Sequence, residues 1–198
     1  MLVSALYNIV DQFFIGNSVG GLGNAATNIA FPLTTSCIAV ALLFGIGGAS
    51  AFNLAMGHGD EEEAVHYMGN AAISMFGCGV CLCLICQIFL DPLVYFFGAP
   101  ENIAGYAKTY IRITSIGFPF LIMSSGGGHL IRADGSPKMS MICNLIGAII
   151  NTILDAMFVF GLHMGMAGAA LATIIGQFIS GGIAIRYLCH CKTVTLKR

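Results

Sequence analysis

Long stretches without a charged residue are the feature that most restricts how this chain can fold. No Asp, Glu, Lys or Arg occurs between Asp11 and Asp60, or between Glu63 and Asp91. Each gap can hold the roughly 20 apolar residues with which a helix crosses the hydrocarbon core of a bilayer. Charged residues make up only 9% of the chain and hydrophobic residues 57%, whereas a soluble domain carries roughly a quarter charged residues. The sequence therefore predicts an all-α integral membrane protein that is surrounded by the lipid bilayer.

Six apolar stretches are predicted to form a bundle of six transmembrane helices. Their approximate bounds are 1–19, 25–56, 64–90, 106–131, 139–160 and 167–188. Pro119 is expected to kink the fourth span. Most basic residues fall in loops on one side, which the positive-inside rule assigns to the cytoplasm: Arg132, Lys138, Arg186, Lys192, Lys197 and Arg198. We expect a multi-pass protein of the plasma membrane with both termini in the cytoplasm.

Composition also argues against several kinds of partner. The formal net charge is −1 and the basic residues are dispersed over loops, so no basic patch for nucleic acid is expected. Four of the eight cysteines, Cys78, Cys81, Cys83 and Cys86, lie inside one apolar run. Disulfide frameworks belong to short secreted chains, and a thiolate metal site would need cationic compensation that this run lacks. We predict no structural metal and no cofactor.

Two acidic residues lie inside predicted spans, and they are the first candidates for function. Asp155 is the only charged residue between Lys138 and Arg186. A carboxylate at membrane depth costs about 2.5–3.5 kcal/mol on insertion scales, so it is rare and usually faces a cavity or a partner. Asp11 lies in the first span in the same way.

Polar residues share a helix face with each of these acids. Asn144, Asn151 and Asp155 are seven and four residues apart, a spacing that puts them on one face of a helix. The other polar residues at helical spacing are Tyr7 and Asn8 beside Asp11, and Thr173, Gln177 and Ser180 in the sixth span.

If these faces converge, they form a polar cavity in a low-dielectric bundle. Such surroundings disfavour the charged form of an acid, which can then load and release a proton near neutral pH. Carboxylate, amide and hydroxyl oxygens are also hard ligands for a cation such as Na⁺. The residues therefore predict a coupling-ion site and leave the choice between H⁺ and Na⁺ open.

Three motifs together resemble the multidrug and toxic compound extrusion (MATE) family. They are Val-Asp-Gln-Phe-Phe-Ile-Gly at 10–16, Arg-Ala-Asp-Gly-Ser-Pro-Lys at 132–138, and Asn-Thr-Ile-Leu-Asp at 151–155 followed by Gly-Met-Ala-Gly-Ala-Ala-Leu-Ala-Thr at 165–173. The resemblance covers essentially the whole chain, as the N-terminal lobe of a family whose members have twelve helices in two six-helix lobes.

The resemblance implies an antiporter that exports varied, often cationic and amphiphilic, compounds in exchange for H⁺ or Na⁺ by alternating access. It implies a coupling site made of Asp11, Asn151, Asp155 and Thr173. Tyr7, Asn8, Asn144 and Gln177 are the weaker candidates for the cavity lining. The C-terminal lobe would then be supplied in cis, or as a second half in trans.

Three alternatives remain at this point. A lipid-linked oligosaccharide flippase of the same superfamily would need a cavity rich in Arg and Lys, and Arg112 is the one basic residue that could lie inside a predicted span. An intramembrane aspartyl protease would use two aspartates, but Ile153-Leu154 stands where that class has Gly-x-Gly before its second aspartate. A non-functional fragment or an isolated half is the third. We expect a transporter and not an enzyme.

Overall fold

The computed structural model describes residues 9, 12–17 and 20–190, and every regular element in these ranges is a helix. After a short helical stretch at 12–17, the elements follow in the order α2 (Gly21–His58), α3 (Glu61–Ile88), α4 (Leu90–Phe96), α5 (Glu101–Thr114), the 3₁₀ turn η1 (Ser115–Gly117), α6 (Phe118–Ala133), α7 (Pro137–Asp155), the π-helix η2 (Ala156–Gly161) and α8 (Gly165–Cys189). The prediction of an all-α fold is confirmed.

Four of the described helical segments are long and apolar enough to cross a membrane: α2, α3, α7 together with η2, and α8. Their exposed surfaces carry large hydrophobic side chains, such as Leu43 on α2, Ile73 on α3 and Ile153 on α7. Apolar side chains on the outside of a bundle face lipid favourably, whereas in water they would form an aggregation-prone surface. The fold is that of an integral membrane protein.

The fourth predicted span is helical but broken in the middle. The chain leaves α5 at Thr114, makes the 3₁₀ turn η1, and enters α6 with Pro119 in its first turn. A proline lacks the N–H that a continuous helix requires and is tolerated in a first turn. Gln87 of α3 stabilises the break, because its Nε2 donates to the carbonyl of Arg112 at 2.8 Å and to Ser115 Oγ at 3.0 Å.

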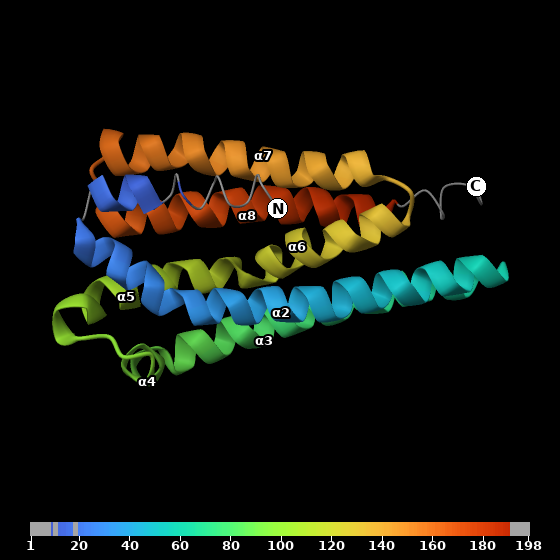
Figure 1. The fold of residues 1–198 in the computed structure, drawn as a ribbon, viewed down its shortest axis with the longest axis horizontal. Helices are drawn as coiled ribbons and strands as arrows, with labels where there is room; N and C mark the ends of the chain where they lie inside the picture. Colours follow the sequence, from blue (N-terminus) through green and yellow to red (C-terminus); the bar gives the residue numbers. More distant parts are fainter. Residues whose placement is uncertain (1–8, 10–11, 18–19, 191–198) are drawn as a thin grey trace.

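The helices pack in pairs along the bundle axis. In Figure 1, α7 and α8 run side by side, α2 and α3 form a second pair, and α5 and α6 lie between the two pairs. Glycines permit the closest approaches: a Cβ on Gly45 of α2 would lie 2.7 Å from the backbone of Gly126 on α6, and a Cβ on Gly176 of α8 would lie 2.9 Å from the carbonyl oxygen of Gly147 on α7. Small residues at helix contacts are the usual packing device in membranes.

Candidate functional site

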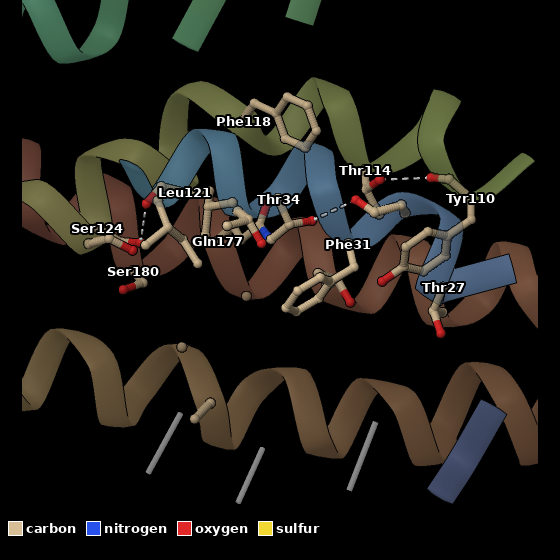
Figure 2. A pocket seen from close by; sticks show the side chains of 18 of the residues that line it. Thr27, Phe31, Thr34, Tyr110, Thr114, Phe118, Leu121, Ser124, Gln177 and Ser180 are labelled. Carbon is tan, nitrogen blue, oxygen red and sulfur yellow. Dashed lines mark hydrogen bonds between the residues drawn. The ribbon is translucent and has the colours of Figure 1, made fainter. Parts of the chain in front are cut away.

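A cavity of about 730 Å³ lies between the helix pairs. Its size is within the range of about 300–1,000 Å³ that is typical of small-molecule sites. Figure 2 shows side chains from α2, α5, α6 and α8 gathered around it, with α7 along the opposite side. The polar residues of the lining carry hydroxyl or amide groups: Gln12, Thr27, Asn28, Thr34, Thr35, Tyr110, Thr114, Ser124, Ser125, Asn144, Thr173, Gln177 and Ser180.

Helix α2 forms one wall of the cavity. Thr27, Phe31, Thr34 and Ile38 line it at spacings of four, three and four residues, so they share one face of the helix. Figure 1 shows α2 bending in its N-terminal part, which contains Pro32. A proline inside a helix removes a backbone hydrogen bond and bends the helix. The bend therefore falls on the section of α2 that borders the cavity.

Asp155 is at the centre of a buried polar cluster beside this cavity. Its side chain is 0% exposed, and Asn151 and Thr173 are also buried. One orientation of the Asn151 amide matches donors with acceptors: Nδ2 donates to Asp155 Oδ2 at 3.2 Å, and Oδ1 accepts from the backbone N–H of Thr173 at 3.2 Å. In the other orientation of the amide, Nδ2 instead donates to Thr173 Oγ1 at 3.5 Å. This network joins α7 to α8.

The helix changes form directly after Asp155. Residue 155 ends α7, and the π-helix η2 begins at Ala156. Short π segments inside α-helices are frequent at functional sites. The ring of Phe160 in η2 packs edge-on against Phe14, with 5.3 Å between ring centroids. The segment that follows the buried acid is thus in contact with the helical stretch 12–17.

The stretch 12–17 is also tied to α2. Gln12 Nε2 donates to Thr27 Oγ1 at 2.9 Å, and the Thr27 hydroxyl donates to the carbonyl of Asn24 at 2.8 Å. Both Gln12 and Thr27 line the cavity. The stretch 12–17 therefore contacts the cavity wall through Gln12 and the π-helix that follows Asp155 through Phe14.

The predicted site residues divide into three groups. Asn144, Thr173, Gln177 and Ser180 line the cavity, so the face predicted for the sixth span meets one residue of the face predicted for the fifth span there. Asn151 and Asp155 are not part of the lining; they lie behind it, and Thr173 belongs to both the lining and the buried cluster. Asp11, Tyr7 and Asn8 lie outside the described residues.

Sequence reasoning missed the walls formed by α2, α5 and α6. The available signal was the repetition of Thr27, Thr34 and Thr35 at helical spacing in an apolar run. Tyr110 and Ser124 gave no such signal, because they come from either side of the break at η1. Gln177 was predicted, but its Oε1 is buried against Gly117 without a hydrogen-bond partner among the described residues.

An all-α membrane bundle with a polar cavity between broken or bent helices is the architecture of a secondary-transporter lobe. The MatE family model matches residues 1–157, and the chain belongs to this family. It is 32% identical to the multidrug export protein MepA of Staphylococcus haemolyticus over 98% of this chain and 43% of that protein. It is 26% identical to an FAD transporter of Shewanella oneidensis over 97% of this chain and 43% of that protein.

Solved structures of MATE transporters are also similar to this chain. The chain superposes on the MATE multidrug transporter DinF-BH with a TM-score of 0.90 and 35% identity, over 98% of this chain and 44% of that one. An outward-facing MATE transporter gives a TM-score of 0.88 at 26% identity, over 95% of this chain and 42% of that one. The chain thus spans less than half the length of the relatives that it matches. These relatives are transporters, so the chain belongs to a transporter family and not to the intramembrane proteases.

Proposed function

We propose that this chain forms one lobe of an ion-coupled antiporter that exports amphiphilic, often cationic compounds. The second lobe would be supplied in cis or by a second chain, and the two would alternate in access around the cavity. The observation that carries the proposal is the buried Asp155–Asn151–Thr173 cluster, which shares Thr173 with a cavity of about 730 Å³. An acid next to a cargo cavity is the arrangement that exchange of an ion for cargo requires.

The geometry favours H⁺ as the coupling ion. In the hydrogen-bonded orientation, Asn151 turns its Nδ2 toward Asp155 and directs its oxygen at the backbone N–H of Thr173. A sodium ion shared by these two side chains would need both a carboxylate and an amide oxygen directed at it. A proton needs no such rearrangement, because it binds to the carboxylate itself.

In this mechanism, loading a proton on Asp155 changes the packing of the first helix. Neutralising the Asp155 carboxylate weakens the charge-assisted hydrogen bond that Asn151 Nδ2 donates to it. The same Asn151 side chain links α7 to α8, because its oxygen accepts from the backbone N–H of Thr173. The π-helix η2 follows Asp155 directly and contacts Phe14. A shift of η2 would therefore move the first helix relative to Thr27 and alter the cavity. The proton must bind more tightly to one of the two conformations between which the transporter alternates, since otherwise it does not shift the equilibrium between them.

The chemistry of the lining favours an amphiphilic cargo over a diphosphate. Among the described lining residues there is no Lys or Arg, and the aromatic rings of Phe31, Tyr110 and Phe118 are present. Diphosphates are normally held by Arg and Lys, whereas aromatic faces attract organic cations. This argues against both a lipid-linked oligosaccharide and a dinucleotide such as FAD as the cargo of this lobe.

We also propose that the α6–α7 turn and the C-terminal end of α8 face the cytoplasm. Arg132, Lys138 and Arg186 belong to these segments, which lie together at one end of the bundle in Figure 1. Lys108 of α5 belongs to the opposite end. The excess of basic residues on the first side supports this orientation.

Dye efflux from cells that express the complete transporter tests the proposed function. Asp155→Asn keeps the shape of the side chain and removes the titratable group, so we expect it to abolish efflux driven by a proton gradient. Glu62→Gln is the matched control, because Glu62 is an exposed acid in the first turn of α3. Unchanged efflux by Asp155→Asn at normal membrane abundance would contradict the proposal.

A gradient exchange in proteoliposomes tests the ion. With H⁺ coupling, dye transport collapses when an ionophore removes the proton gradient and persists in sodium-free buffer. Dye transport that persists without a proton gradient and stops in sodium-free buffer would contradict H⁺ coupling and indicate Na⁺ as the coupling ion.

A further inference from the structure

The short helix α4 joins α3 to α5 and does not follow the direction of the bundle. In Figure 1 the long helices run across the page, whereas α4 is seen nearly end-on at one end of the bundle. Its axis therefore lies across the bundle axis. Phe89 separates it from α3, which ends at Ile88, and Asp91 and Pro92 lie in its first turn.

The length of α3 puts α4 at the depth of the lipid headgroups. Helix α3 has 28 residues, which is about 42 Å at 1.5 Å per residue. The hydrocarbon core of a bilayer is about 30 Å thick, and about 40–45 Å with both headgroup layers. A centred α3 thus ends within the headgroup layer, where α4 begins.

Helix α4 has a buried face and an exposed aromatic face. Leu90 and Val94 are buried against the bundle, whereas Tyr95 and Phe96 are exposed. The side chain of Phe96 is 82% exposed, the largest fraction among the exposed large hydrophobic residues that the structure describes. The exposed Phe89 precedes the helix and continues this surface toward the apolar outside of α3.

The charges beside this aromatic face neutralise each other. Lys108 Nζ of α5 lies 2.7 Å from Asp91 Oδ1 and 4.9 Å from the centroid of the Tyr95 ring. A lysine can keep its ammonium group near water while its apolar stem lies along an aromatic ring. Aromatic rings beside polar groups are the composition of the membrane–water interface.

We propose that α4 is an interfacial anchor, which lies in the headgroup layer of the bilayer with the rings of Phe89, Tyr95 and Phe96 inserted at the boundary of the acyl chains. The partner is the lipid surface itself. Exposed apolar side chains follow one another along the chain from the end of α3 to α4: Leu84, Ile85, Ile88, Phe89, Tyr95 and Phe96. The anchor fixes the depth of the α3–α5 connection and, through α5, of the break at η1.

The chain contains no tryptophan, so a single Trp reports on one site without background. We would purify Phe96→Trp, reconstitute the chain in phosphatidylcholine vesicles, and compare quenching by lipids that are brominated near the headgroup with quenching by lipids brominated near the chain ends. Ile73→Trp is the matched control, because Ile73 is 73% exposed and lies near the middle of α3. Phe89→Trp is the second test variant if Phe96→Trp does not fold.

We expect the ratio of shallow to deep quenching to exceed one for Phe96→Trp and to fall below one for Ile73→Trp. Three results would overturn the proposal. The first is a ratio for Phe96→Trp equal to that of Ile73→Trp, which would put α4 in the hydrocarbon core. The second is quenching by aqueous iodide but by neither lipid, which would put it in water. The third is protection from lipid and iodide alike, which would mean that protein covers it.

Discussion

The contact between α2 and α6 allows a sharp test of the packing. A Cβ on Gly45 would lie 2.7 Å from both the Cα and the carbonyl oxygen of Gly126, and neither backbone atom can move away on its own. Two residues along the same helix, a Cβ on Gly47 would meet no atom within 4 Å. Gly45→Ala and Gly47→Ala therefore add the same methyl group, which collides with the backbone of α6 at position 45 and meets no neighbour at position 47.

The expected magnitude follows from two terms. Both substitutions gain about 0.8–1.0 kcal/mol of helix propensity, and this gain cancels in the comparison. Only Gly45→Ala forces α2 and α6 apart, and overpacking typically costs about 1–3 kcal/mol. For a chain of this size each kcal/mol shifts the melting temperature by about 2–4 °C. Gly45→Ala should thus melt several degrees below Gly47→Ala.

Circular dichroism of the helical signal, recorded on both variants in the same detergent, measures this difference. Equal melting temperatures, or a higher one for Gly45→Ala, would refute the close contact between α2 and α6. A direct readout of the same distance is a spin-label pair on the two helices, which should separate in Gly45→Ala and remain unchanged in Gly47→Ala.

Two further predictions concern the site and the ion pair between α4 and α5. Thr173→Val should weaken proton-coupled efflux, because it removes a hydroxyl group from the cavity lining beside Asn151, whereas Thr152→Val should not, because Thr152 is not part of that lining. Each hydroxyl donates to the carbonyl four residues earlier, so the stability lost, about 1 kcal/mol, should be similar. Equal efflux by the two variants would contradict this role of Thr173. The hydrogen bond and the positive charge of Lys108 hold the pKa of Asp91 below its usual range, so Lys108→Met should raise that pKa in a carboxyl NMR titration. The Asp91–Lys108 pair stabilises the fold at pH values above the ordinary Asp pKa of about 3.9. This contribution is lost as the pH falls through the lowered pKa of Asp91 in the folded state. The free energies of unfolding of Lys108→Met and the wild type should therefore differ at neutral pH and become equal in acid.

The helical class and the core of the site could be predicted from sequence for simple physical reasons. Runs without charge that are longer than a bilayer is thick leave few folds open to the chain. The spacing of Asn151 and Asp155 fixes their shared face whatever the tertiary structure, because helical periodicity is local. The approach of Thr173 to both was inferred from the resemblance, and the structure brings the three together.

Other features depend on tertiary packing and could not be predicted in this way. The π-helix after Asp155 has no local signature in Ala156–Gly161, a run of ordinary apolar residues. The Asp91–Pro92 pair predicted a span that ends at residue 90, whereas α3 ends at Ile88 and the pair lies in the first turn of α4. Nothing local indicated that the chain would form α4 across the bundle. Thr34 and Thr114 each donate to a carbonyl of their own helix, which any membrane threonine can do, so sequence alone did not identify them as cavity residues.

The central claim is that Asp155, held by Asn151 and Thr173, carries the proton that is exchanged for cargo. Proton release on binding a cationic dye, measured with the purified complete transporter in weakly buffered detergent, tests it most directly. If cargo and proton compete, binding must release protons by linkage, about one for each dye molecule bound. We predict this release for the wild type and for Glu62→Gln, and its absence in Asp155→Asn. Undiminished release by Asp155→Asn, with dye still bound, would contradict the claim.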